Sequence, residues 1–177
     1  MRERTTLAIG LVAVSLLLSA CSTEPAEVPV AADNPYGGFD VPPPAPDDIV
    51  LSVDGPAPLE LSLVDLQGFP RTSVTIVEPF VQEEHTYEGV LLEEIFTRAG
   101  ISPDTTVDTV ALNDYRYSDV AEVLIASGAI LAFFEDGEPI AMNRGGPLRI
   151  VFADDSNYFA ELEAWNWSLR TIKQLPE

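Results

Sequence analysis

Residues 87–101, Tyr-Glu-Gly-Val-Leu-Leu-Glu-Glu-Ile-Phe-Thr-Arg-Ala-Gly-Ile, contain the clearest structural signal of the chain. From Val90 to Ala99 the apolar residues recur at intervals of three and four, which places them on one face of an amphipathic helix. Glutamates lie in its first turn and Arg98 in its last, where the helix dipole favours each charge. Gly100 can adopt the left-handed conformation that ends many helices. The pattern predicts a helix over residues 90–99 with one buried face.

Short runs of β-branched and apolar residues on both sides of this helix are typical of strands. Two further short helices are predicted, one capped by Ser62 and one by Ser118 or Asp119, because these side chains can accept hydrogen bonds from the first N–H groups of a helix. Strands and helices alternate irregularly, which predicts an α+β fold with a mixed sheet and short helices. The predicted strands cover residues 49–53, 73–77, 107–112, 130–134, 148–152 and 165–172.

The N-terminal segment has the features of an export signal. Two arginines precede an apolar run over residues 7–18, which is shorter than the roughly 20 residues that span a bilayer. Ser19-Ala20-Cys21 follows and resembles the lipobox of bacterial lipoproteins. The resemblance implies cleavage before Cys21, the only cysteine of the chain, and attachment of lipid to its thiol. The alternative is an ordinary secretory signal in which the cysteine occurs by chance.

Three segments are therefore expected. Residues 1–20 are predicted to be a lipoprotein signal peptide, and residues 21–48 a lipidated cysteine followed by a disordered tether rich in proline and acidic residues. Residues 49–177 are predicted to form one folded domain. The predicted location is outside the cytoplasm, with the lipid anchored in the cell membrane or in an outer membrane.

Charge and cysteine content restrict the function further. The net charge of −20 at pH 7 would repel phosphates, so no nucleic-acid partner is expected. If Cys21 carries lipid, no thiol remains for a disulfide, for a thiolate metal ligand or for a cysteine nucleophile. The folded domain must then be held together by its core alone.

Several motifs of the domain occur in the order found in the molybdopterin-binding domain of sulfite-oxidase-like oxidoreductases, which the chain resembles from about residue 51 onward. The resemblance implies the fold of that domain and, in catalytic members, a molybdenum-bearing pterin cofactor. The matching motifs are Leu-Ser-Val-Asp-Gly at 51–55, the segment 61–70 with its short helix, Tyr-Glu-Gly-Val-Leu-Leu at 87–92 with Ala-Gly-Ile at 99–101, Gly-Gly-Pro-Leu-Arg at 145–149, and the tryptophan-containing segment 165–172.

The chain departs from the family pattern where the metal would bind. In catalytic members a cysteine thiolate ligates molybdenum, and the resemblance places it after the strand 73–77, near Glu78. This chain has Glu-Pro-Phe-Val-Gln-Glu at 78–83 instead, and Arg144 stands where a histidine is often found. We therefore expect no catalytic residue, no metal ligand and no cofactor. Binding of molybdopterin is the less favoured alternative.

Arg144, Gly145, Gly146 and Arg149 are the predicted cofactor-binding residues. Glycines permit close approach of the backbone, and guanidinium groups bind phosphate or carboxylate, so this loop could hold an anionic ligand. A tight turn explains the glycines equally well, and Arg149 could instead pair with an acidic residue of the domain or point outward.

A histidine and two tryptophans are further candidates for a binding site. His85, the only histidine, is expected to be exposed, because it lies in an acidic segment. Trp165 and Trp167 are expected to line the core or a groove.

These features together predict a membrane-tethered extracytoplasmic lipoprotein. Its sulfite-oxidase-like domain is expected to be non-catalytic and to bind a small ligand, such as an anion, or an envelope protein. One alternative is an oxidoreductase that binds a molybdopterin cofactor without a cysteine ligand. The other is an accessory subunit of an envelope complex.

Overall fold

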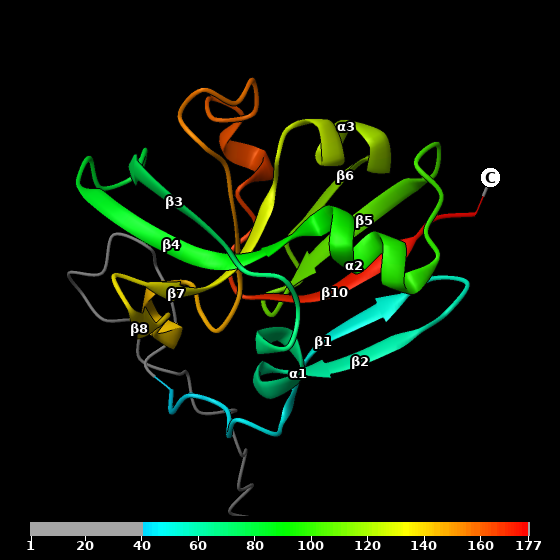
Figure 1. Ribbon diagram of the computed structural model, residues 1–177, viewed down its shortest axis with the longest axis horizontal. Coiled ribbons are helices and arrows are strands. Elements are labelled where there is room, and N and C mark those ends of the chain that lie inside the picture. Colours follow the sequence, from blue (N-terminus) through cyan, green and yellow to red (C-terminus); the bar gives the residue numbers. More distant parts are fainter. Residues whose placement is uncertain (1–40, 177) are drawn as a thin grey trace, which may run out of the picture.

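Two β-sheets organise the described part of the chain, residues 41–176 of a computed structural model (Figure 1). The first sheet has the strand order β2-β1-β10-β5-β6. Its strands β1 and β10 run parallel, whereas its other pairs are antiparallel. The sheet is therefore mixed, as predicted. Its strands are β1 (Ile49–Asp54), β2 (Leu59–Ser62), β5 (Thr106–Ala111), β6 (Arg116–Val120) and β10 (Leu169–Gln174).

The second sheet is antiparallel and has the order β3-β4-β7-β8, with β9 also paired to β7. Short helices connect the strands, and the predicted α+β class is confirmed. The strands are β3 (Thr72–Val77), β4 (Glu84–Leu91), β7 (Ile130–Glu135), β8 (Glu138–Pro139) and β9 (Arg149–Val151). The helices are α1 (Leu63–Gln67), α2 (Leu92–Ala99) and α3 (Ala121–Ala126), with the 3₁₀ turns η1 (Met142–Arg144) and η2 (Leu162–Ala164).

The segment that contains the strongest helix signal divides between a strand and a helix. Val90 and Leu91 pair with β7, so helix α2 begins at Leu92, two residues later than predicted. It ends at Gly100 in the left-handed conformation (φ 69°), as predicted. The preceding Gly89 lies at a register shift of β4, and a Cβ there would lie 2.0 Å from the carbonyl oxygen of Leu131. Glycine is thus required because β4 and β7 approach so closely.

Two other boundaries also differ from the sequence prediction. Ser118 and Asp119 belong to β6, so neither caps α3, which begins after Val120 without a side-chain cap. The predicted strand at 165–172 begins only at Leu169, directly after Ser168, whose positive φ of 52° is not a strand conformation. By contrast, Ser62 caps α1 as predicted, through a reciprocal pair of hydrogen bonds with Asp65.

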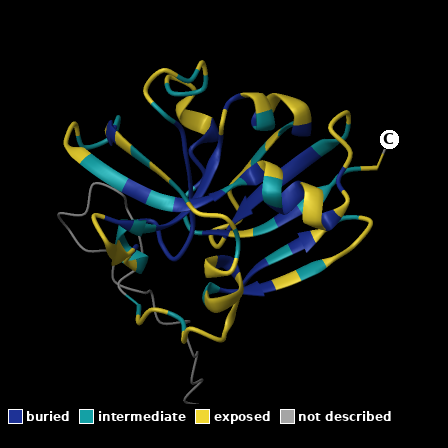
Figure 2. Ribbon diagram, in the orientation of Figure 1, coloured by how far each residue is buried: buried dark blue, intermediate teal, exposed yellow. Residues whose placement is uncertain are grey.

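The core lies where the strands of the two sheets approach each other, and exposed residues cover the outer faces of the helices (Figure 2). Within residues 41–176, no helix combines the length and apolar character needed to cross a bilayer. The predicted signal peptide and Cys21 lie outside the described residues.

The last residues of the predicted tether are ordered against the domain. The Asp48 amide donates to the carbonyl of Ala45, and its carboxylate accepts from the amide of Ala45. The Val64 amide at the start of α1 donates to the carbonyl of Pro46. Ordered structure therefore begins before residue 49, the predicted start of the domain.

Candidate functional site

Glu78 follows β3 directly, and its side chain is completely buried. One carboxylate oxygen, Oε2, accepts hydrogen bonds from the backbone amides of Phe80 (2.8 Å) and Val81 (2.9 Å). The other, Oε1, accepts from Nη2 of Arg149 at 2.8 Å. The loop after β3 therefore folds back on its own first side chain, and both carboxylate oxygens have partners.

Arg149 comes from β9 and is also completely buried. Besides its bond to Glu78, its Nη1 donates to the Tyr87 hydroxyl at 3.2 Å. Its guanidinium carbon lies 4.8 Å from the ring centroid of Trp167, within range of a cation–π interaction. A buried ion pair is stable only when further bonds compensate the loss of hydration. The surroundings of Glu78 and Arg149 supply such bonds.

A second carboxylate extends this arrangement toward the surface. The Tyr87 hydroxyl donates to Oε1 of Glu135 at 3.0 Å. Arg144 binds the same carboxylate in a bidentate manner, Nε to Oε2 and Nη2 to Oε1, both at 2.8 Å. We call the connected side chains of Glu78, Arg149, Tyr87, Glu135 and Arg144 the buried polar network. It links β3, β4, β7, η1 and β9.

Electrostatics within the network favour the ionised carboxylate of Glu135. Burial raises the pKa of Glu135. The stronger combined effect comes from Arg144, through its hydrogen bonds and its charge, together with the Tyr87 hydroxyl and the more distant charge of Arg149. The pKa of Glu135 therefore lies below its usual range. At neutral pH this carboxylate is therefore a stable anion paired with Arg144.

His85 lies at the outer end of the network. The prediction that it is exposed is wrong, because only 11% of its side chain is exposed. Its Nδ1 lies 2.7 Å from the Asp136 carboxylate and 3.6 Å from that of Glu135. The strand pairing explains this burial, since β4 places His85 two residues from Tyr87 and beside the β7–β8 turn.

The predicted cofactor loop is packed against the protein itself. Gly145 has a φ of 81°, and a Cβ on it would lie 3.0 Å from Cβ of Trp167. A Cβ on Gly146 would lie 2.0 Å from the carbonyl oxygen of Ile140. Both glycines are buried. The close backbone approach that they permit is made to the chain's own residues.

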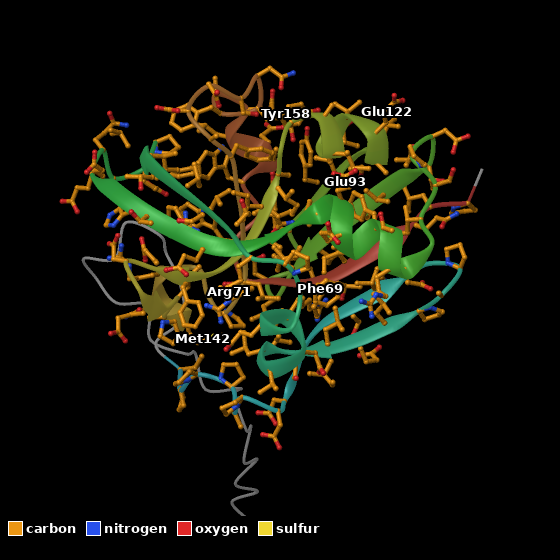
Figure 3. The ribbon with its side chains drawn as sticks, in the orientation of Figure 1. Phe69, Arg71, Glu93, Glu122, Met142 and Tyr158 are labelled. Atoms are coloured by element: carbon orange, nitrogen blue, oxygen red, sulfur yellow. The ribbon has the colours of Figure 1, made fainter. Side chains whose placement is uncertain are left out.

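The structure brings Arg144, Gly145, Gly146 and Arg149 together, and both guanidinium groups bind carboxylates of the domain. For Arg149, the alternative of pairing with a domain acid is the one observed. Arg71 is separate from the network: it lies near β7 with its guanidinium 5.5 Å from the Phe134 ring (Figure 3). Binding of an external anion by the loop stays a prediction.

Sequence reasoning did not identify Tyr87 or Glu135. They face each other across β4 and β7 because the register of these strands pairs them directly. No local pattern specifies that register. Glu78 was noticed only because the resemblance places the family's thiolate near it.

The side chains of this site do not fit a thiolate-held molybdenum cofactor. Both oxygens of Glu78, at the position implied for the thiolate, are already bound by Phe80, Val81 and Arg149. Among residues 41–176, no group of three or more His, Cys, Asp or Glu side chains is arranged to hold a metal ion. The chain's cysteine, Cys21, lies outside these residues.

Comparison with known proteins identifies the fold independently. The family model described as "Oxidoreductase molybdopterin binding domain" matches residues 39–158. A solved structure, the sulfane dehydrogenase SoxCD from Paracoccus pantotrophus, is similar with a TM-score of 0.61 and 21% sequence identity. The similar region covers 76% of this chain but only 40% of that one. A search of curated proteins found no match.

The ion pair between Glu78 and Arg149 predicts a large effect on stability. The variant Arg149→Met leaves the Glu78 carboxylate buried without its cation, so we expect the free energy of unfolding to fall by about 3–5 kcal/mol. Urea denaturation at pH 7 measures this loss. The double variant Glu78→Gln/Arg149→Met should lose less than the sum of the two single variants, because it buries no uncompensated charge. Additive losses would contradict the pairing.

The lowered pKa of Glu135 predicts a dependence of stability on pH. A carboxyl whose pKa is depressed by folding contributes stability above its unfolded pKa, about 4.3, and this contribution disappears as the pH falls through the folded value. Wild type should therefore exceed Glu135→Gln in stability at pH 7, and the difference should shrink at acidic pH. Denaturation curves across this range measure it.

The control for this pH experiment is Glu138→Gln, an exposed carboxyl on the neighbouring strand β8. It should change the stability by no more than about 0.5 kcal/mol. If wild type exceeded Glu135→Gln in stability by the same amount at every pH, folding would not lower the pKa of Glu135.

Proposed function

Since the chain belongs to the oxidoreductase molybdopterin binding domain family, we propose that it is a non-catalytic member of that family, a ligand-binding domain tethered to a membrane outside the cytoplasm. The observation that carries the proposal is the ion pair between Glu78 and Arg149. It stands where the resemblance implies a metal-binding thiolate, and it leaves neither side chain available for a metal.

The charge of the site supports the proposal. A molybdopterin cofactor is an anion and requires basic groups that are available to its phosphate. In this domain the guanidinium groups of Arg144 and Arg149 are matched by the carboxylates of Glu135 and Glu78. The net charge of the whole chain, −20, further disfavours an anionic cofactor.

The tethering part of the proposal depends on the N-terminal sequence. The apolar run at 7–18 followed by Ser19-Ala20-Cys21 supports export and lipidation. The lipid would hold the protein at the membrane, while the acidic domain would be repelled by anionic lipids. The proline-rich segment after Cys21 would serve as a spacer. A small ligand or an envelope protein would then be bound at the membrane surface.

Cofactor content tests the non-catalytic part. We expect protein purified from its native host to contain no stoichiometric molybdenum by elemental analysis and no pterin fluorescence after oxidative release. A cysteine-containing member of the family, purified from the same cells, is the control that shows the cofactor was being supplied. One molybdenum per chain would overturn the proposal in favour of an oxidoreductase that binds the cofactor without a cysteine.

Lipidation is tested by Cys21→Ser. Without the thiol no lipid can be attached, so we expect the variant to leave the membrane fraction or to keep its leader. Membrane fractionation and mass spectrometry of the N-terminal peptide measure both outcomes. The control Ser22→Ala keeps the thiol and should fractionate like wild type. If Cys21→Ser also behaved like wild type, the predicted anchor would be wrong.

A further inference from the structure

A cavity of about 330 Å³ opens beside the buried polar network. Four aromatic rings line it: Phe80 from the loop after β3, Tyr115 from the turn between β5 and β6, and Trp165 and Trp167 from the segment before β10. Asn113, Leu162 and Glu163 complete the wall. The volume lies at the lower end of the range of about 300–1,000 Å³ for ligand sites, so it suits a small molecule.

We propose that this aromatic cavity binds a small organic cation of the quaternary ammonium class. The inference names a ligand class for the binding role proposed above and rests on that role. The ring geometry of the cavity and the charge around it carry the inference.

The rings are set steeply to one another. The Phe80 ring meets the Trp167 ring at 74° with centroids 4.5 Å apart, and the Trp165 ring at 78° with centroids 6.0 Å apart. A flat ligand stacks best between parallel rings. A compact rounded cation can instead contact several π faces and edges at once, and such aromatic cages are the usual sites for quaternary ammonium groups.

The rings are also held in place before any ligand arrives. Nε1 of Trp165 donates to the carbonyl of Phe159 at 3.2 Å, and the Tyr115 hydroxyl donates to the carbonyl of Glu163 at 2.9 Å. The loop that contains Phe159 is fixed in turn by Tyr158, labelled in Figure 3, whose hydroxyl donates to the carboxylate of Asp119. A preformed cage loses little conformational entropy on binding.

The charge around the cavity favours a cation. Glu163 is the charged residue in the wall, and no Lys or Arg occurs among its described lining residues. Burial raises the pKa of Tyr115, and the negative charges of the nearby Glu163 and Glu161 carboxylates at the rim raise it further.

Intrinsic fluorescence tests the proposal directly, because the chain has two tryptophans and both line the cavity. The full chain, in a maltoside detergent, would be titrated with tetramethylammonium and with choline, using sodium chloride as the ionic-strength control. We expect a saturable change in emission. The neutral isostere 3,3-dimethylbutan-1-ol should bind about tenfold more weakly, since it lacks the charge that the rings attract.

Variants at Tyr115 provide a matched pair. Tyr115→Phe and Tyr115→Leu both remove the hydroxyl, but only the leucine removes the ring. The side chain is 43% exposed, so neither change disturbs the core. We expect choline affinity to stay within about twofold for phenylalanine and to fall about fivefold or more for leucine.

Three outcomes would overturn the proposal: no saturable change with either cation, equal affinity for the neutral isostere, or wild-type affinity in Tyr115→Leu. Vesicles of phosphatidylcholine, compared with phosphatidylglycerol vesicles, distinguish a lipid headgroup from free choline as the source of the ammonium. Both sources support the proposal.

Molybdenum analysis of the same preparation separates this inference from the proposed function. Metal together with choline binding would contradict only the non-catalytic assignment. Absence of both metal and choline binding would contradict only the ligand class.

Discussion

The ion pair between Glu78 and Arg149 is the interaction on which the rest of the site depends. Neither side chain is exposed, so each charge is compensated within the protein. Two backbone amides and one guanidinium bind the carboxylate, and a tyrosine hydroxyl and an indole ring contact the guanidinium. The pair joins the end of β3 to β9. The backbones of Arg149 and Trp167 form an isolated β-bridge. The pair therefore also contacts the segment that leads into β10 of the other sheet. Removal of one partner would therefore affect both sheets.

The same pair determines the shape of the surface beside it. Because the loop after β3 folds back to donate amides to Glu78, it carries Phe80 against Trp167. The aromatic cavity thus results from the local structure around Glu78. The guanidinium of Arg149 packs against the Trp167 ring and so stabilises this aromatic wall from the protein interior. Molybdopterin-binding family membership describes the fold, whereas the side chains at this point decide what the domain can bind.

Sequence reasoning predicted the parts of the fold that depend on local patterns. The α+β class, the helix that ends at Gly100 and the cap at Ser62 are confirmed, because periodicity and capping are properties of neighbouring residues. Errors occurred where a distant strand competes with a local preference. Val90 and Leu91 have a helical pattern, yet pairing with β7 keeps them in a strand. His85 has acidic neighbours in the sequence, yet the β7–β8 turn covers it.

By itself the sequence determined the α+β class, the helix that ends at Gly100 and the resemblance to the family, but it did not predict the strands β2 and β4. It also determined that Arg144, Gly145, Gly146 and Arg149 form one loop and strand. Only the tertiary structure decided what these residues contact. Glu78 and Arg149 are 71 positions apart, and Tyr87 and Glu135 are 48 apart. The physical reason is that the whole core sets strand register and loop packing. A charged side chain whose partner is not apparent in the sequence therefore acquires that partner only when the sheets assemble.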